Sequence, residues 1–177
     1  MKTFIISILT ITICLNTSGQ TKEIVQRNIH NIKSVPLYYL KGFLYNQKVK
    51  RQDLIKDSSY LQITRLDTFA LQYLIPFLGD TTLTGIINEC LQAKFKIADI
   101  AFFLINDIET VPFALVTGGQ YCTWTECGGL PDGFFSYVNR ERQRFKNEYT
   151  KYFYGDKREE WKKLFYRKPL KKKNKQT

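Results

Sequence analysis

Two cysteines in the stretch TGGQYCTWTECGGLPDG, residues 117–133, have the types and spacing for disulfide or metal chemistry. A structural zinc ion needs four ligands, and the only set in the chain is Cys90, Cys122 and Cys127 with His30, the sole histidine. Because this histidine lies far from the cysteines in sequence and no second close cysteine pair accompanies them, we expect no metal. We predict a Cys122–Cys127 disulfide that fixes the shape of the loop. Cys90 is either a buried free thiol or bonded to one of the loop cysteines.

Carboxylates offer the second kind of chemistry. Asp107 and Glu109 lie in the segment INDIE, and Glu126 lies between the two loop cysteines. Hydrolysis of a glycosidic bond needs two such groups, so a small hydrolase of an envelope polymer is one alternative. Carboxylates at helix ends and caps are the simpler interpretation. A nucleophilic triad would have to use His30, and no cofactor-binding motif is present, so we expect no cofactor.

The aromatic and polar residues of the same loop indicate binding rather than catalysis. Trp124 lies at its tip, with Gln120 and Tyr121 nearby. Exposed tryptophan and tyrosine suit the face of a sugar or a protein partner. In the opposing interpretation the loop folds back and Trp124 covers an apolar patch.

Helices must position this loop, because apolar residues recur at helical spacing along most of the chain. The pattern predicts helices over residues 66–77, with Pro76 bending the last turn, and over 95–109. A short helix from Thr82 competes with a strand, since Gly85 and its β-branched neighbours disfavour helix.

After the loop, an apolar stripe predicts one long helix that ends near Gly155, followed by a last helix capped by Asp156. The stripe consists of Phe134, Val138, Phe145, Tyr149 and Tyr152. No segment alternates with a period of two over a sustained length. The predicted fold is therefore all-α, a single compact domain of five to seven helices.

The chain begins with MKTFIISILTITICLNTSGQ, which predicts a signal peptide over residues 1–19. Its apolar run is too short to cross a bilayer about 30 Å thick. Lipidation at Cys14 is less favoured, because the bulky Ile13 precedes it. We expect an exported protein in the periplasm, on the outer surface or secreted. It would have one helical domain over residues 20–168 and a disordered basic tail over 169–177.

The net charge of +11 is concentrated at the C-terminus. Residues 20–139 hold eleven basic and eleven acidic side chains, whereas residues 140–177 hold fifteen and five. A basic end of this kind suits an anionic surface, such as an envelope polymer or lipid head groups. An exported protein rarely meets nucleic acid, so no nucleic-acid partner is expected.

The segment LIPFLGDTT at 74–82, followed by ADIAFFLINDI at 98–108, resembles the helix pair of HEAT-type repeat proteins. The match covers about a fifth of the chain, without a second copy at the period of about 40 to 47 residues that a solenoid requires. The resemblance implies a curved stack of helices that binds a partner, with no catalytic residues. The chain also resembles exported bacterial proteins, which implies no particular activity.

These features favour an exported, non-enzymatic binding protein of the bacterial envelope. Its partner would be a protein or an envelope polymer, contacted through the disulfide-constrained loop. The hydrolase using Asp107, Glu109 or Glu126 is the first alternative. A periplasmic inhibitor or immunity-type protein, which would share the features of the binding protein, is the second.

Overall fold

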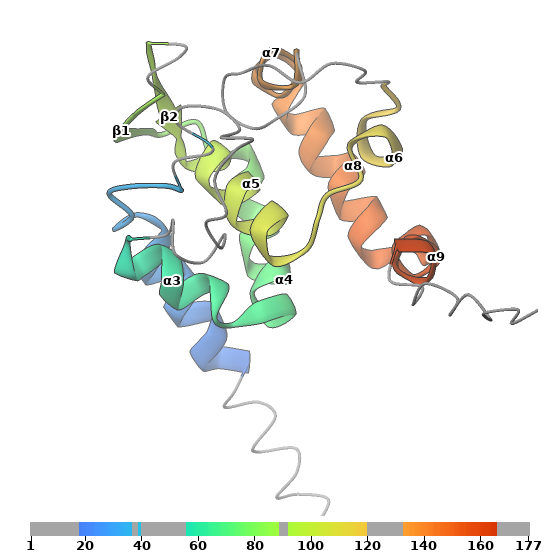
Figure 1. The fold of residues 1–177 in the computed structure, drawn as a ribbon, viewed down its shortest axis with the longest axis horizontal. Helices are drawn as coiled ribbons and strands as arrows, with labels where there is room; N and C mark the ends of the chain where they lie inside the picture. Colours follow the sequence, from blue (N-terminus) through green and yellow to red (C-terminus); the bar gives the residue numbers. More distant parts are fainter. Residues whose placement is uncertain (1–17, 37–38, 40–55, 89–91, 120–132, 166–177) are drawn as a thin grey trace, which may run out of the picture.

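The computed structural model describes residues 18–36, 39, 56–88, 92–119 and 133–165. These residues are mostly helical and include one two-stranded antiparallel sheet (Figure 1). A helix over residues 18–29 comes first. The elements that follow are α3 (Ser58–Thr64), η2 (Asp67–Ala70), α4 (Leu71–Leu74), η3 (Ile75–Gly79), β1 (Leu83–Asn88), β2 (Ala93–Lys96), α5 (Ile97–Ile108), α6 (Phe113–Thr117), α7 (Phe134–Arg140), α8 (Arg142–Tyr154) and α9 (Asp156–Phe165).

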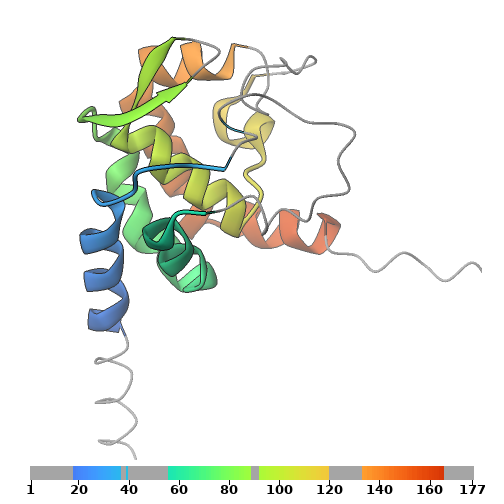
Figure 2. The same cartoon turned by 60° about the vertical axis from the view of Figure 1, so that its left-hand side comes forward.

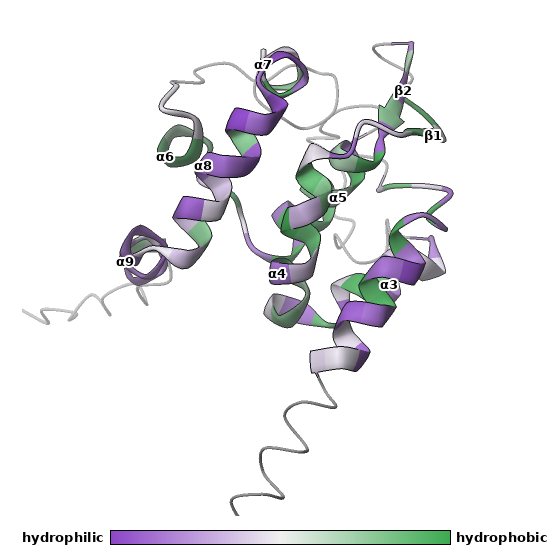
Figure 3. Ribbon diagram, turned by 180° about the vertical axis from the view of Figure 1, so that it is seen from behind, coloured by the Kyte–Doolittle hydropathy of each residue, from purple (hydrophilic) through white to green (hydrophobic). Residues whose placement is uncertain are grey.

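Helix α5 forms the centre of the molecule. It packs against η3, α4, α3 and β2, while α8 packs against the other side of η3 and against α6, α7 and α9. Every residue from Ile97 to Ile105 is buried, so this helix is apolar around nearly its whole circumference rather than along one face (Figure 3). The helix predicted over residues 95–109 is confirmed over residues 97–108, whereas residues 95 and 96 belong to β2. α5 contacts elements from both halves of the chain. Its side chains bond to Tyr39 and Tyr60 before it in the sequence and to Arg142 after it.

The hairpin β1–β2 lies at the start of α5 (Figure 2). Ile86 and Phe95 are buried, whereas Leu83 and Ile87 are exposed, as expected for a strand with one face on the core. The pairing shifts in register between Leu83 and Ile87. In this shifted part, the Thr84 hydroxyl donates to the carbonyl of Phe95 at 2.9 Å.

The strictly all-α prediction is wrong at this hairpin, and so is the short helix predicted from Thr82. Thr84, Ile86 and Ile87 are β-branched and Gly85 is flexible, so the segment has little intrinsic preference for helix. The burial of side chains on one face of the segment favours the strand over the helix. The mostly helical character of the chain is confirmed.

The segment before the hairpin is more broken than the single helix predicted over residues 66–77. It consists of η2, α4 and η3, and η3 begins next to Pro76, which cannot donate a helical hydrogen bond. Among its apolar residues, Phe69 is exposed while Leu71 and Leu78 are buried. The apolar residues on both faces of this segment left the choice of face undetermined in the sequence.

The predicted aromatic stripe after the loop is confirmed, because all five of its residues are buried. It is carried by two helices instead of one. The chain leaves helical geometry at Glu141, where φ is −113° and ψ is 31°, and this residue separates α7 from α8. Gly155 ends α8 and α9 starts at Asp156, as predicted.

The two segments that resemble a HEAT helix pair are η3 and α5, which do pack against each other. A hairpin separates them in the chain, where a HEAT repeat has a turn. The N-terminal helix over residues 18–29 adds Val25 and Ile29 to the same core. Asp57 attaches the segment that follows this helix, because its carboxylate accepts from the backbone N–H groups of Lys33 at 2.9 Å and Ser34 at 3.2 Å.

Candidate functional site

The loop that the sequence singled out lies outside the described residues from Gln120 to Asp132. Tyr121, Cys122, Trp124, Glu126 and Cys127 fall in this part, so their predicted roles stay predictions. The residues on either side of it are described. α6 ends at Gly118 with φ 70°, and α7 begins after Gly133 with φ 72°. Both conformations favour glycine.

The helices on either side of the loop, α6 and α7, contact each other. The rings of Phe113 in α6 and Phe134 in α7 are 4.7 Å apart, in an edge-to-face arrangement. Phe134 is fully buried and also contacts Phe102 of α5, with ring centroids 4.8 Å apart. The scaffold therefore fixes where the chain enters and leaves the loop.

Asp107, one of the predicted catalytic carboxylates, binds two buried tyrosines. Its Oδ1 accepts from the Tyr39 hydroxyl at 2.9 Å and its Oδ2 from the Tyr60 hydroxyl at 2.8 Å. The Tyr39 ring stacks on Phe103 at 3.9 Å, and its hydroxyl also accepts from Asn106 at 3.1 Å. Both carboxylate oxygens thus hold the N-terminal half of the chain against α5.

Glu109, the second predicted carboxylate, binds Arg158 of α9. Nε and Nη2 of this arginine each donate to one oxygen of Glu109, both at 2.7 Å, and Lys162 Nζ lies 3.5 Å from Oε2. The guanidinium also lies over the Phe153 ring, 4.2 Å from its centroid. We call these three charged residues the Glu109 clamp. It attaches α9 to the C-terminal end of α5.

The charges of the clamp change the pKa values around it. Burial raises the pKa of the Glu109 carboxyl, but the hydrogen bonds and positive charges of Arg158 and Lys162 outweigh it, so the net pKa lies below its ordinary value. The hydrogen bond to Glu109 raises the pKa of Arg158. Burial and the nearby Glu109 charge raise the pKa of the Tyr149 hydroxyl. Glu109 is therefore an ionised structural partner, and nothing in its contacts leaves an oxygen for a substrate.

Asp107 and Glu109 are not brought together as an acid–base pair. They lie on the same helix but contact different parts of the molecule, the first the N-terminal tyrosines and the second α9. A two-carboxylate mechanism needs both groups to face one bond. Within the described residues, no three His, Cys, Asp or Glu side chains gather closely enough to hold a metal ion.

The basic helices are less free to attract an anionic partner than their composition indicates. Several of their cations already have acidic neighbours within 4 Å: Arg140 with Glu141, Arg142 with Asp99, Lys151 with Glu148, Arg158 with Glu109, and Lys162 with Glu109 and Glu159. The stretch with the greatest excess is residues 166–177, which hold six basic and no acidic side chains and lie outside the described residues.

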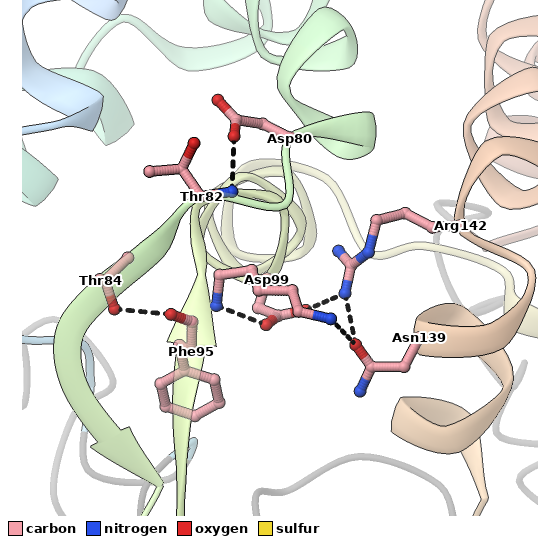
Figure 4. A network of polar contacts seen from close by, with 8 residues as sticks. Asp80, Thr82, Thr84, Phe95, Asp99, Asn139 and Arg142 are labelled. Carbon is pink, nitrogen blue, oxygen red and sulfur yellow. Dashed lines mark hydrogen bonds and ion pairs between the residues drawn. The ribbon is translucent and has the colours of Figure 1, made fainter.

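A second charged group lies at the opposite end of α5 from the Glu109 clamp. Arg142 Nη2 donates to Asp99 Oδ1 at 3.0 Å and to Asn139 Oδ1 at 2.7 Å (Figure 4). Lys96 Nζ donates to the same Asn139 oxygen at 3.1 Å, and the Lys96 backbone N–H donates to Asp99 Oδ2 at 2.7 Å. We call these four residues the α5 entry cluster. They join the end of β2, the first turn of α5 and the junction of α7 with α8.

The cluster is buried on one side and exposed on the other. Asp99 and Arg142 are 5% and 6% exposed, whereas Asn139 is exposed. Among the described residues, no acceptor bonds to Arg142 Nε or Nη1, although both atoms are buried. An arginine carries five N–H donors, and leaving buried donors unpaired is costly. The cluster therefore contains two buried donor nitrogens that no acceptor satisfies among the described residues.

One feature of the sequence indicated this cluster, namely an arginine at an apolar position of the aromatic stripe. Arg142 lies four residues after Val138 and three before Phe145, so it occupies a core-facing position of the aromatic stripe. An arginine in such a position needs a buried acid. Asp99 is that acid. In the sequence, the helix dipole alone explains its place in the first turn of the helix.

No family model matches the chain, and no curated protein or solved structure is significantly similar to it. Among the described helices, none is long and apolar enough to cross a membrane. What the protein does must therefore be argued from its own residues.

Proposed function

We propose that the protein is an exported, non-enzymatic binding protein of the bacterial envelope that contacts a partner through the loop around Trp124. The observation that carries this proposal is the use of Asp107 and Glu109. Each has both carboxylate oxygens bonded to groups of the protein itself, which favours a structural role for these two residues over a catalytic one. A hydrolase would have to rely on other carboxylates, such as Glu126, which lies outside the described residues.

The scaffold around the loop supports a binding role. A half-buried and a buried phenylalanine, Phe113 and Phe134, hold the helices on either side of the loop together, and glycines in the left-handed region stand at both ends of the loop. Loops on a rigid scaffold commonly carry binding residues, because their sequence can vary without disturbing the core. A tryptophan within such a loop is the residue type that most often anchors a partner.

The test is a pull-down from the native cell envelope with the mature protein and with Trp124→Ala. We expect the variant to lose most of the captured partner. Phe69→Ala is the matched control, because Phe69 is 72% exposed and lies on η2, so this variant removes an aromatic side chain without touching the loop. Equal recovery with Trp124→Ala and with the wild type would refute the role of the loop.

Counting thiols in the denatured mature protein tests the disulfide separately. A Cys122–Cys127 bond leaves one free thiol, that of Cys90, because the fourth cysteine of the chain lies in the predicted signal peptide. Three free thiols would exclude the bond. The fixed positions of the loop ends would then be the only constraint on its shape.

A further inference from the structure

The oxygen of Asn139 lies between two positive charges. It is 3.1 Å from the ammonium nitrogen of Lys96 and 2.7 Å from Nη2 of Arg142. A neutral amide is a weak partner at such a point, because hydrogen bonds from cations are strongest when the acceptor is an anion. Asn139 is exposed, so its side chain can turn into the solvent and leave the space between the two cations to an oxygen that binds them more strongly.

The charges around this point favour an anion. Among the described residues, Asp99 is the only carboxylate that bonds to Lys96 or Arg142, and its two oxygens accept from Arg142 and from the Lys96 backbone. Lys96 forms no ion pair with any described residue. Two cations therefore face one carboxylate, and the α5 entry cluster has a net positive charge before a ligand binds.

Arg142 provides the second, independent observation. The guanidinium is buried, yet Nη2 makes both of its bonds while Nε and Nη1 have no acceptor among the described residues. The ammonium group of a solvent-exposed lysine would satisfy itself with water, but this guanidinium is held away from water. An anionic oxygen in place of the amide would accept from Nη2, and it would bring a second negative charge to a guanidinium whose only counter-ion among the described residues is Asp99.

We propose that the α5 entry cluster binds the anionic oxygen of a phosphate or carboxylate group, which takes the place of Asn139 Oδ1 between Lys96 and Arg142. This site is defined by residues other than the loop around Trp124, so it is tested without the loop. The ligand chemistry is that of phosphorylated or uronic-acid-type envelope polymers and of acidic peptides. Small anions therefore serve as probes.

The experiment measures the melting temperature of the mature protein as inorganic phosphate or acetate replaces chloride at constant ionic strength. A ligand that binds only the folded state raises the melting temperature in a saturable way. We expect saturation by at least one of the two anions, with a dissociation constant on the order of 1 mM. The tighter of the two identifies the group that the site prefers.

Asn139→Asp is the decisive variant. It places a carboxylate of the protein between Lys96 and Arg142, so added phosphate or acetate should bind about tenfold more weakly or not at all. Asn147→Asp is the matched control, because it adds the same charge at an exposed position of α8 where the side chain contacts only Gln143 at 3.1 Å. This control should keep the response of the wild type.

The outcomes separate specific binding from a general effect of salt. Loss of the response in Asn139→Asp but not in Asn147→Asp supports the site. Equal responses in all three proteins, or no saturable response to either anion, would overturn it. Neither result bears on the pull-down with Trp124→Ala, so this site and the loop stand or fall separately.

Discussion

The two ends of α5 carry the same kind of ion pair in two different states. At the C-terminal end, Glu109 receives two parallel bonds from Arg158 and a third contact from Lys162. At the N-terminal end, Asp99 receives one nitrogen of Arg142, and two other nitrogens of this arginine have no acceptor among the described residues. Both arginines come from the C-terminal helices, and both carboxylates are about 5% exposed.

The difference shows how a structural ion pair can be told from a site that can bind. A bidentate arginine and carboxylate satisfy each other, so both oxygens of Glu109 are already bonded within the protein. The α5 entry cluster holds the protein together as well, but its arginine has donors left over and its amide lies where an anion would be stronger. Burial alone does not distinguish the two.

The largest expected effect comes from removing Asp99. Asp99→Ala leaves the Arg142 guanidinium buried without a counter-ion and removes the acceptor for the Lys96 N–H, so we expect a loss of about 3–5 kcal/mol in the free energy of unfolding. Urea unfolding at neutral pH measures it. Glu160→Ala, at an exposed position of α9, should change stability by less than about 0.5 kcal/mol. A similarly small effect for Asp99→Ala would show that the buried pair is not formed.

Removing Glu109 should cost less. Arg158 and Lys162 have side chains that are 14% and 28% exposed, so both can reach water once their partner is gone. For Glu109→Ala we expect a loss of about 2 kcal/mol in the free energy of unfolding. A loss larger than that of Asp99→Ala would reverse the comparison between the two ends.

The clamp should also make stability depend on pH. The folded-state pKa of Glu109 lies below its ordinary value of 4.5, so its ionised form stabilises the folded state above that pH. This stabilisation is lost as the pH falls through the lower, folded-state pKa. The stability difference between the wild type and Glu109→Gln should be constant near neutral pH and shrink below about pH 4.5. Urea unfolding from pH 7 to 3 measures it, and a difference that grows on acidification would contradict the prediction.

The smallest expected effect is a gain. Asn139→Asp, without any ligand, should raise the free energy of unfolding by about 0.5–1 kcal/mol, because its carboxylate accepts from Lys96 and Arg142. The negative charge in the last turn of α7 opposes this gain but is weaker than two nearby cations. Asn147→Asp should not show it. A loss of stability in Asn139→Asp would mean that the cluster does not favour an anion.

The parts of the fold that were predictable from sequence are those with one clear period. α5 and the aromatic stripe from Phe134 to Tyr152 follow helical spacing and are buried as that spacing requires. The hairpin was missed because a short helix was predicted from Thr82 although Gly85 and its β-branched neighbours disfavour helix, and the packing of Ile86 and Phe95 on the core favours the strand. The break at Glu141 left no mark on the stripe, because α7 and α8 continue the same face.

The candidate site was harder to predict than the fold. Asp107 and Glu109 look alike in sequence, and only their contacts show that each is already engaged by residues from distant parts of the chain. The pairing of Asp99 with Arg142 spans 43 positions, and no local pattern reports it. The position of Arg142 within an apolar stripe was the one available signal. It predicts a buried acidic partner but does not identify which residue this is.

The most direct test of the difference between the two ends is a side-chain NMR titration with inorganic phosphate. It follows the ¹⁵N signals of the arginine and lysine side chains in the mature protein. We expect the signals of Lys96 and Arg142 to move in a saturable way while those of Arg158 and Lys162 stay in place. Equal movement at both ends, or movement only at Arg158 and Lys162, would contradict it.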